Sequence, residues 1–173
     1  MAKIKATLIS EKITSNTTEA QNLFSISRFG EKFGEKILYS LPEAFFLSQD
    51  KKMEILNHQG KKLSQKEILK KFERIDKKFK TKYIVFKDLR KKGYVVKTAL
   101  KFGAEFRVYE KNKKVGRTHS KWILFPVSEN TQMTWQDFAA KNRVAHSTKK
   151  NLLVAIVDEE GDASYYEIKW ILP

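Results

Sequence analysis

Three side chains suited to acid–base chemistry or charge stabilisation lie near the ends of apolar segments in the second half of the chain. Tyr109 ends the alternating segment AEFRVY, and His119 follows it by ten positions across the basic loop KNKKVGRT. Lys150 comes just ahead of the apolar run LLVAIV. The strand–loop–histidine layout allows Tyr109 and His119 to lie near one another.

These residue types match what metal-free cleavage of RNA requires. RNA carries its own nucleophile, the 2′-OH, so a site must supply a base for it, an acid for the 5′-oxygen and a cation for the transition state. Histidine is the natural acid near neutral pH, and lysine is a compact positive charge. Tyrosine acts as a base only where neighbouring cations lower its pKa. Arg107 and the lysines of the loop at 111–114 could supply those cations.

The spacing alone leaves other interpretations open. A tyrosine that ends a strand more often packs or lies at an edge, a lone histidine after a loop is more often inert, and the chain is rich in lysine. His146 competes as the acid, although an imidazolium in the last turn of a predicted helix would also complement the helix dipole. A metal-dependent nuclease would need converging carboxylates. The candidates for that alternative are scattered along the chain: Asp88, Glu105, Asp158 and Glu159.

Charge and composition restrict the class of protein. The chain has 35 Lys and Arg against 20 Asp and Glu in 173 residues, a net charge of +15. This favours a polyanionic partner such as nucleic acid, although genomic base composition can also enrich lysine. The absence of cysteine excludes disulfides and thiolate metal sites. We find no signal-peptide core and no apolar run near the roughly 18 residues of a membrane span, so we expect a soluble, cytoplasmic protein. The chain also has no Walker A loop, no GxGxxG before a helix and no HExxH, and we expect no cofactor.

The elements that must position these side chains predict an α/β domain near residues 82–173 with a central mixed β-sheet. A helix should end at Gly93, and alternation in AEFRVYE places Tyr109 on the polar face of its strand. The apolar segment SKWILFPV should be a central strand that ends at Pro126. The remaining predicted elements are a helix over 134–147, a strand over 152–157, a hairpin turn at 159–162 and the return strand SYYEIKWIL.

Residues near 1–78 predict a smaller α+β domain without evident chemistry. The segments KIKATLIS and NLFSISRFG look β-like, and two capping boxes, Ser40–Glu43 and Ser64–Glu67, predict the starts of two helices. The lysine-rich segment DKKFKTK at 76–82 lacks glycine and proline, so we expect a short, semi-ordered connection between the domains.

The second half of the chain strongly resembles the tRNA-splicing endonuclease family of archaeal type. The resemblance rests on YIVFKDLRKKGYVVKTALKFGAEFRVYE, the following HS, and FAAKNRVAHSTKKNLLVAIVDEEGD, in consistent order over about residues 82–170. Residues 1–80 resemble the N-terminal domain of that family more loosely, chiefly at SLPEAFFL. The matched positions imply that Tyr109 is the general base, His119 the general acid and Lys150 the stabiliser of the transition state. The chain is then expected to be a catalytic subunit.

The resemblance also implies a substrate, its products and RNA contacts. Family members cut precursor tRNA at bulge–helix–bulge junctions without metal, leaving a 2′,3′-cyclic phosphate and a 5′-OH. Arg143 matches an arginine that stacks on a flipped-out bulge base, and Tyr165 or Tyr166 is the nearest candidate for its partner. Arg107 and Lys101 are expected to contact phosphate.

The C-terminal residues match segments that assemble the family's subunits. The strand SYYEIKWILP would pair with its counterpart in another subunit, giving an isologous dimer that covers Trp170, Ile171 and Leu172. An acidic turn resembles a loop that docks in a basic cleft of an opposing subunit, although a solvated hairpin tip explains it equally well. That turn contains Asp158, Glu159, Glu160 and Asp162. Both a homo-oligomer (dimer or tetramer) and a two-plus-two heterotetramer with a non-catalytic paralogue fit. The alternative function is a non-catalytic RNA-binding or assembly subunit, against which the intact Tyr–His–Lys set argues.

Overall fold

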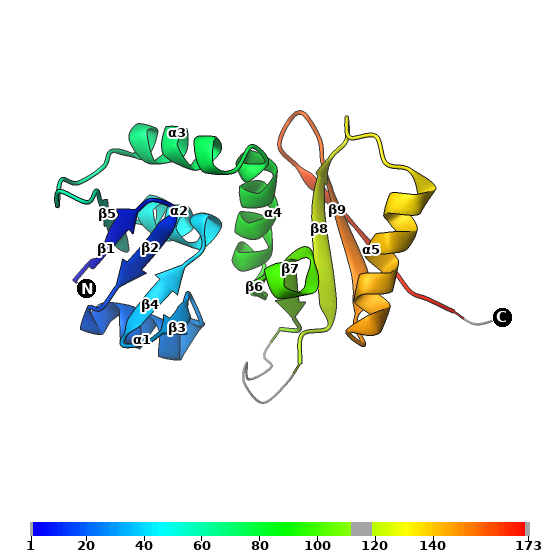
Figure 1. Cartoon of the computed structure of the whole chain (residues 1–173), viewed down its shortest axis with the longest axis horizontal. Helices are drawn as coiled ribbons and strands as arrows, with labels where there is room; N and C mark the ends of the chain where they lie inside the picture. The colour runs from blue at the N-terminus through cyan, green and yellow to red at the C-terminus, as the bar shows by residue number, and fades with distance from the viewer. Residues whose placement is uncertain (1, 112–118, 172–173) are drawn as a thin grey trace. The chain divides into compact units, whose positions relative to one another are not determined.

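The chain divides into two compact units, residues 1–83 and 84–173, with the boundary inside helix α4 (Phe79–Lys91) (Figure 1). The structure is a computed structural model that describes residues 2–111 and 119–171. Residues 79–82, which the sequence suggested as part of a connection, are helical. None of the described helices has the length and hydrophobicity needed to cross a lipid bilayer.

The first unit is built on a five-stranded sheet in the order β3-β4-β2-β1-β5, in which β1 and β5 are parallel and the other pairs antiparallel. Its strands are β1 (Ile4–Ile9), β2 (Lys12–Ser15), β3 (Glu31–Phe33), β4 (Lys36–Tyr39) and β5 (Met53–Leu56). Its helices are α1 (Thr18–Ser27), α2 (Leu41–Gln49), α3 (Gln65–Ile75) and the start of α4. The predicted α+β class of this unit is confirmed.

Helix α1 corrects the sequence interpretation of NLFSISRFG as a β-like segment. Thr17 caps the helix by accepting a hydrogen bond from the backbone N–H of Ala20, and Glu19 lies in the first turn, where a carboxylate complements the helix dipole. Arg28 ends the helix in the left-handed conformation. The local N-terminal signals therefore prevail over the β-propensity of the phenylalanine and isoleucine that follow.

The two predicted capping boxes are present and begin α2 and α3. In each box, the serine hydroxyl accepts from the backbone N–H of the glutamate three residues later, and that carboxylate accepts from the backbone N–H of the serine. Between the two helices and α4 lies an aromatic cluster with ring centroids 4.8–6.2 Å apart. Its members are Phe45, Phe72, Phe79 and Tyr83, and all four are buried. This packing fixes α3 on the first unit.

The second unit contains the predicted mixed sheet, in the order β10-β9-β8-β7-β6. β8 and β9 are parallel, and the other neighbours are antiparallel. The strands are β6 (Val95–Ala99), β7 (Ala104–Tyr109), β8 (Trp122–Ser128), β9 (Asn151–Val157) and β10 (Ala163–Ile168). A 3-10 turn, η1 (Leu100–Phe102), joins β6 to β7, and helix α5 (Trp135–Ser147) joins β8 to β9.

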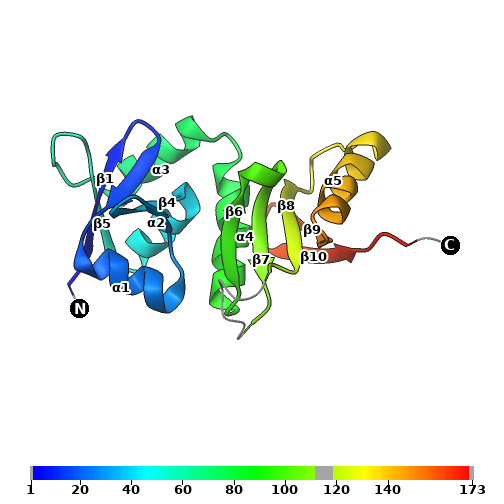
Figure 2. The ribbon, with the colours of Figure 1, turned by 60° about the horizontal axis from the view of Figure 1, so that its bottom comes forward.

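Helices cover both faces of this sheet, as Figure 2 shows. On one face, Ile123 and Leu152 pack with Ala145 of α5. On the other, Phe86 of α4 contacts Phe106, with ring centroids 6.0 Å apart. We call the side that packs against α5 the α5 face and the other side the α4 face. Because neighbouring residues of a strand point to opposite faces, each side chain of the sheet can be assigned to one helix.

Strand β8 is central, as predicted, but the expectation that it ends at Pro126 is wrong. Pro126 is paired with Ala155 of β9, and the strand runs on to Ser128. β7 pairs with β8 only as far as Leu124, so Pro126 has a neighbouring strand on one side alone. A proline is tolerated there because its missing N–H can face the unpaired side.

Candidate active site

In the second unit, the segments that carry Tyr109, His119 and Lys150 lie at the same edge of the sheet. This edge is formed by the ends of strands and not by an outer strand. β7 runs toward this edge, whereas β8 and β9 start from it. The backbone N–H of Lys121 donates to the carbonyl of Val108 at 3.0 Å, and the N–H of Asn151 donates to the carbonyl of Lys121 at 3.0 Å. Tyr109 therefore ends β7, His119 precedes β8, which pairs with β7, and Lys150 precedes β9, which pairs with β8.

Tyr109 is 6% exposed, so the expectation that it lies on a solvent-exposed face is wrong. Val108 lines a pocket with Leu89 of α4, and alternation puts Arg107 and Tyr109 on the α5 face. Arg107 is paired with Ile123, which packs against α5. Tyr109, on the face that looked polar in the sequence, is therefore buried.

His119 is exposed and lies three residues ahead of β8. The next residue, Ser120, is buried, and the backbone of Lys121 is already part of the sheet. His119 thus lies in the short segment that leads into a fixed strand. An exposed imidazole at this position can exchange protons with solvent and with a bound molecule.

Lys150 is half-buried between the end of α5 and the start of β9. Its backbone N–H donates to Ala145 at 2.9 Å, and its ammonium Nζ donates to the carbonyl of Thr148 at 2.8 Å. Lys149 adopts the left-handed conformation (φ 56°), which turns the chain from helix into strand. The side chain is held by this tight connection instead of extending freely into solvent.

The pKa of Lys150 is perturbed by its surroundings. Burial lowers its pKa below the ordinary lysine value, and the nearby guanidinium of Arg107 lowers it further. Because the two cations repel one another, binding of an anion close to both would be favourable. A phosphate, or a phosphorane-like transition state, has the charge that such a pair would stabilise.

A pocket of about 500 Å³ lies beside Lys150, between the end of α5 and the C-terminal segment. One wall is the ring of His146 stacked on Trp170, with centroids 4.6 Å apart and planes at 29°. Asn142, one helical turn before His146, also lines it, as do Lys149 and Lys169. Sequence reasoning considered His146 as an acid but missed this wall. The i, i+4 spacing of Asn142 and His146 ahead of Lys150 is the signal that could have indicated it.

The residues expected to contact RNA do not all gather at this edge. Arg143 is exposed on α5, in the helix that also contributes the pocket wall. Lys101 is exposed in η1, at the opposite end of β7 from Tyr109. Tyr165 lies on the α4 face, where its hydroxyl donates to Asp88 at 2.7 Å. Burial, then this bond to Asp88, raises the pKa of Tyr165. Tyr166 has the opposite orientation and is 55% exposed.

The segments expected to assemble subunits lie at two further places. The acidic turn follows β9, at the other end of this strand from Lys150. Hydrogen bonds between Asp158 and Asp162 close the turn. Glu159 accepts from the side chain of Asn130 at 3.1 Å. β10 is an edge strand, and beyond it Trp170 and Ile171 are exposed. Three residues named in the sequence interpretation fall outside the described part of the chain: Lys113, Lys114 and Leu172.

Within residues 2–111 and 119–171, no three His, Asp or Glu side chains form a group that could hold a metal ion. Asp88, a candidate ligand in the metal-nuclease alternative, is bound to Lys92 at 2.7 Å and to the Tyr165 hydroxyl.

Comparison with known families finds a match for each half of the chain. Residues 79–166 match the family described as tRNA intron endonuclease, catalytic C-terminal domain, and residues 4–69 match the tRNA intron endonuclease N-terminal domain. The chain belongs to the tRNA intron endonuclease family. The resemblance inferred from the sequence motifs is confirmed.

Relatives from several archaea match along nearly the whole chain. A tRNA-splicing endonuclease of Pyrococcus abyssi is 41% identical over 165 residues, which are 95% of this chain and 94% of that protein. One from Nanoarchaeum equitans is 43% identical over 155 residues, 83% of this chain and 99% of its own length. One from Methanothermobacter thermautotrophicus is 36% identical over 172 residues, 99% of both chains. The family and these names assign the chain to the endonucleases of tRNA splicing.

Proposed function

We propose that this protein cleaves precursor tRNA at bulge–helix–bulge exon–intron junctions by metal-independent attack of the 2′-OH. The products would be a 2′,3′-cyclic phosphate and a 5′-OH. Tyr109 would remove the proton of the 2′-OH, His119 would protonate the leaving 5′-oxygen, and Lys150 would stabilise the charged transition state. Family membership supports the reaction class, and the chemistry of these three side chains supports the mechanism.

The observation that carries the mechanism is the meeting of three chain segments at one sheet edge, with two cations beside it. The backbone bonds of Lys121 to Val108 and Asn151 join the end of β7 to the start of β8, and the start of β8 to that of β9. Burial and then Arg107 lower the pKa of Lys150, as expected for two cations that repel one another.

In this proposal, residues 82–173 are the catalytic domain and residues 1–78 the N-terminal domain. Arg143 would stack on an unpaired bulge base near the pocket wall, and Arg107 would contact the scissile phosphate. Lys101, at the far end of β7, would contact phosphate elsewhere on the RNA. Tyr166 is better placed than Tyr165 to complete a stack with Arg143, since Tyr165 is directed at α4.

The protein would act as an assembly of subunits. β10 leaves one edge of the sheet unpaired, and Trp170 and Ile171 next to it are 46% and 78% exposed. Pairing of this edge with a second copy would cover both side chains. The acidic turn would dock on a basic surface of another subunit. A homo-oligomer and a heterotetramer with a paralogue remain the two forms, and the mass of the purified chain in solution separates them.

Single-turnover cleavage of a bulge–helix–bulge RNA tests the assignment of the acid. His119→Ala should abolish cleavage while RNA binding stays near that of the wild type. The matched control is His58→Ala, an exposed histidine of the first unit, which should cleave normally. If His146→Ala abolished cleavage and His119→Ala did not, the acid would be His146. Lys150→Ala should slow the reaction by about 10²–10³, the usual loss for an electrostatic donor.

A further inference from the structure

The exposed face of α3, in the first unit, carries a row of positive charges. Lys66, Lys70 and Arg74 are spaced four residues apart, so they lie on one side of the helix, about 6 Å from each other along its axis. All three are exposed, and they lie opposite the buried side of α3, which Ile68 and Phe72 form. We name these three residues the α3 row.

The carboxylates near the α3 row are already engaged. Glu67 completes the capping box of α3 by accepting from the N–H of Ser64 at 2.8 Å. Glu73 pairs with Lys80 at 3.1 Å, and Asp76 pairs with Lys82 at 2.7 Å. Within the described part of the chain, no ion pair neutralises the three members of the row.

Like charges one turn apart destabilise a helix, so this arrangement is unfavourable unless an anion lies on it. The surface also lacks what a protein partner would need. The large apolar side chains of the segment are turned inward, with Leu63, Ile68, Phe72 and Phe79 all buried. Protein interfaces have an apolar centre, whereas a row of cations without one suits a nucleic-acid backbone.

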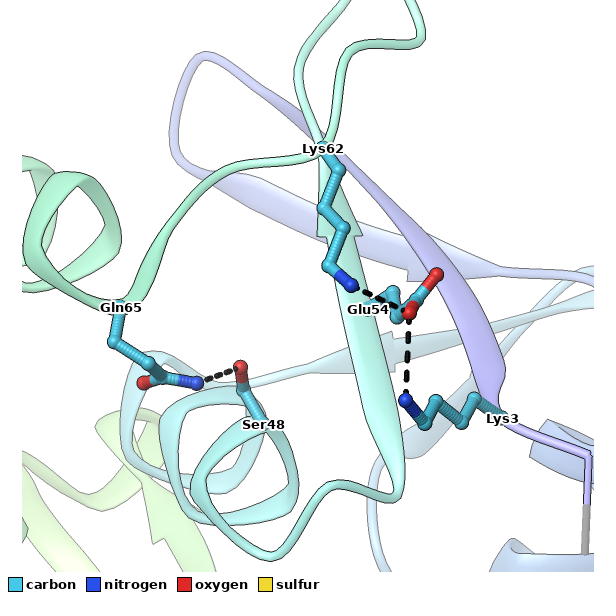
Figure 3. Close-up of polar contacts among 5 residues, drawn as sticks. All are labelled: Lys3, Ser48, Glu54, Lys62 and Gln65. Atoms are coloured by element: carbon cyan, nitrogen blue, oxygen red, sulfur yellow. Dashed lines mark hydrogen bonds and ion pairs between the residues drawn. The ribbon is translucent and has the colours of Figure 1, made fainter.

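A polar pocket adjoins the N-terminal end of the α3 row. It has a volume of about 690 Å³, and its lining includes Ser64 and Gln65, which directly precede Lys66. In Figure 3, the Gln65 amide donates to the Ser48 hydroxyl at 2.7 Å on one side of the pocket.

On the other side of the pocket, lysines outnumber the carboxylate. Lys62 and Lys3 both pair with Glu54, at 2.6 and 3.6 Å, as Figure 3 shows. The exposed Lys51 also lines the pocket, and no described carboxylate pairs with it. Hydroxyl, amide and ammonium groups around one cavity are the groups that bind phosphate oxygens. The pocket is lined by the two residues that directly precede the α3 row in the chain.

We propose that the α3 row, with the pocket at its N-terminal end, binds the RNA sugar–phosphate backbone. The proposal rests on the proposed function for the identity of the RNA, but not for the contact itself, because backbone contacts carry no sequence information. Each cation of the α3 row would neutralise one phosphate. The catalytic unit would then select the junction, and the first unit would add affinity from the body of the RNA.

The salt dependence of RNA binding by the full-length chain tests the proposal. The variant Lys66→Gln/Lys70→Gln/Arg74→Gln keeps helix-forming residues but removes three charges. The slope of log K against log salt should become shallower by about 2 to 3, because each lost phosphate contact contributes roughly 0.7–0.9. The matched control Lys5→Gln/Lys12→Gln/Lys36→Gln removes three exposed charges from the strands of the same unit. Its slope of log K against log salt should change less than that of the α3 variant.

Two RNAs separate failure of this proposal from failure of the proposed function. Precursor tRNA reports cleavage by the wild type, and mature tRNA, which has no junction to cut, reports backbone binding alone. The α3 variant should weaken binding to both. A charge-conserving variant, Lys66→Arg/Lys70→Arg/Arg74→Lys, should restore it, which excludes a folding defect. A slope equal to that of the matched control would overturn the proposal. So would an unchanged slope with a changed oligomeric mass, which would assign the surface to an acidic protein partner.

Discussion

Removing the hydroxyl of Tyr165 should destabilise the second unit while leaving its ring in place. In Tyr165→Phe, Asp88 loses the bond at 2.7 Å but keeps its pair with Lys92. A hydrogen bond to a charged group contributes about 1.5–3 kcal/mol to the free energy of unfolding. The Asp88 side chain is 33% exposed, so water partly replaces the lost bond, and we expect about 1–2 kcal/mol. For a unit of this size, this corresponds to a fall in Tm of about 4 °C or more.

The matched control is Tyr166→Phe, and denaturant unfolding of the full chain is the assay. Tyr166 is 55% exposed and its hydroxyl bonds no described residue, so its loss should change stability by less than about 0.5 kcal/mol. The pH dependence gives a second check. Folding raises the pKa of Tyr165 above the ordinary value of about 10. The contribution of Tyr165 to the free energy of unfolding is therefore fully present below about pH 10 and is lost as the pH rises through the folded pKa. The difference in free energy of unfolding between the wild type and Tyr165→Phe should therefore become smaller above about pH 10. Equal stability of the two phenylalanine variants would refute this reasoning.

Two further predictions concern the first unit and the candidate site. Gly30 and Gly34 both have positive φ, but an added Cβ at Gly30 would collide with Ile37, whereas Gly34 is open. Gly30→Ala should therefore lower the free energy of unfolding by about 1–3 kcal/mol more than Gly34→Ala, and equal losses would contradict the packing. Arg107→Gln should raise the pKa of Lys150, since the guanidinium lowers it, and lysine Nζ NMR titration measures this directly. An unchanged or lower pKa would show that the two cations do not interact.

Local signals in the sequence predicted much of the fold. The capping boxes at Ser40 and Ser64 depend on residues three positions apart, so they can be seen without tertiary information. The apolar segments of β8 and β9 indicated two buried strands, and the long helical connection between them is compatible with parallel pairing. α1 was missed because its phenylalanine and isoleucine resemble a strand, whereas its start is fixed by the Thr17 cap.

The sequence named candidate site residues, but it did not reveal their burial or the residues around them. Alternation along β7 separates Tyr109 from Val108, yet it does not reveal that both side chains are buried. The wall made by His146 and Trp170 joins residues 24 positions apart, through a C-terminal segment that follows β10. The direction of Tyr165 toward Asp88 likewise depends on the register of β10 against β9. Such contacts arise from tertiary packing, which no local pattern encodes.

The central claim is a metal-independent cleavage in which the 2′-OH of the RNA is the nucleophile. The most direct measurement is the chemistry of the ends produced when the purified chain, with a paralogue if it needs one, cleaves a bulge–helix–bulge RNA in excess EDTA. Tyr109, His119 and Lys150 predict full cleavage, with a 2′,3′-cyclic phosphate on one product and a 5′-OH on the other. Strict dependence on Mg²⁺, with 3′-OH and 5′-phosphate ends, would contradict the account.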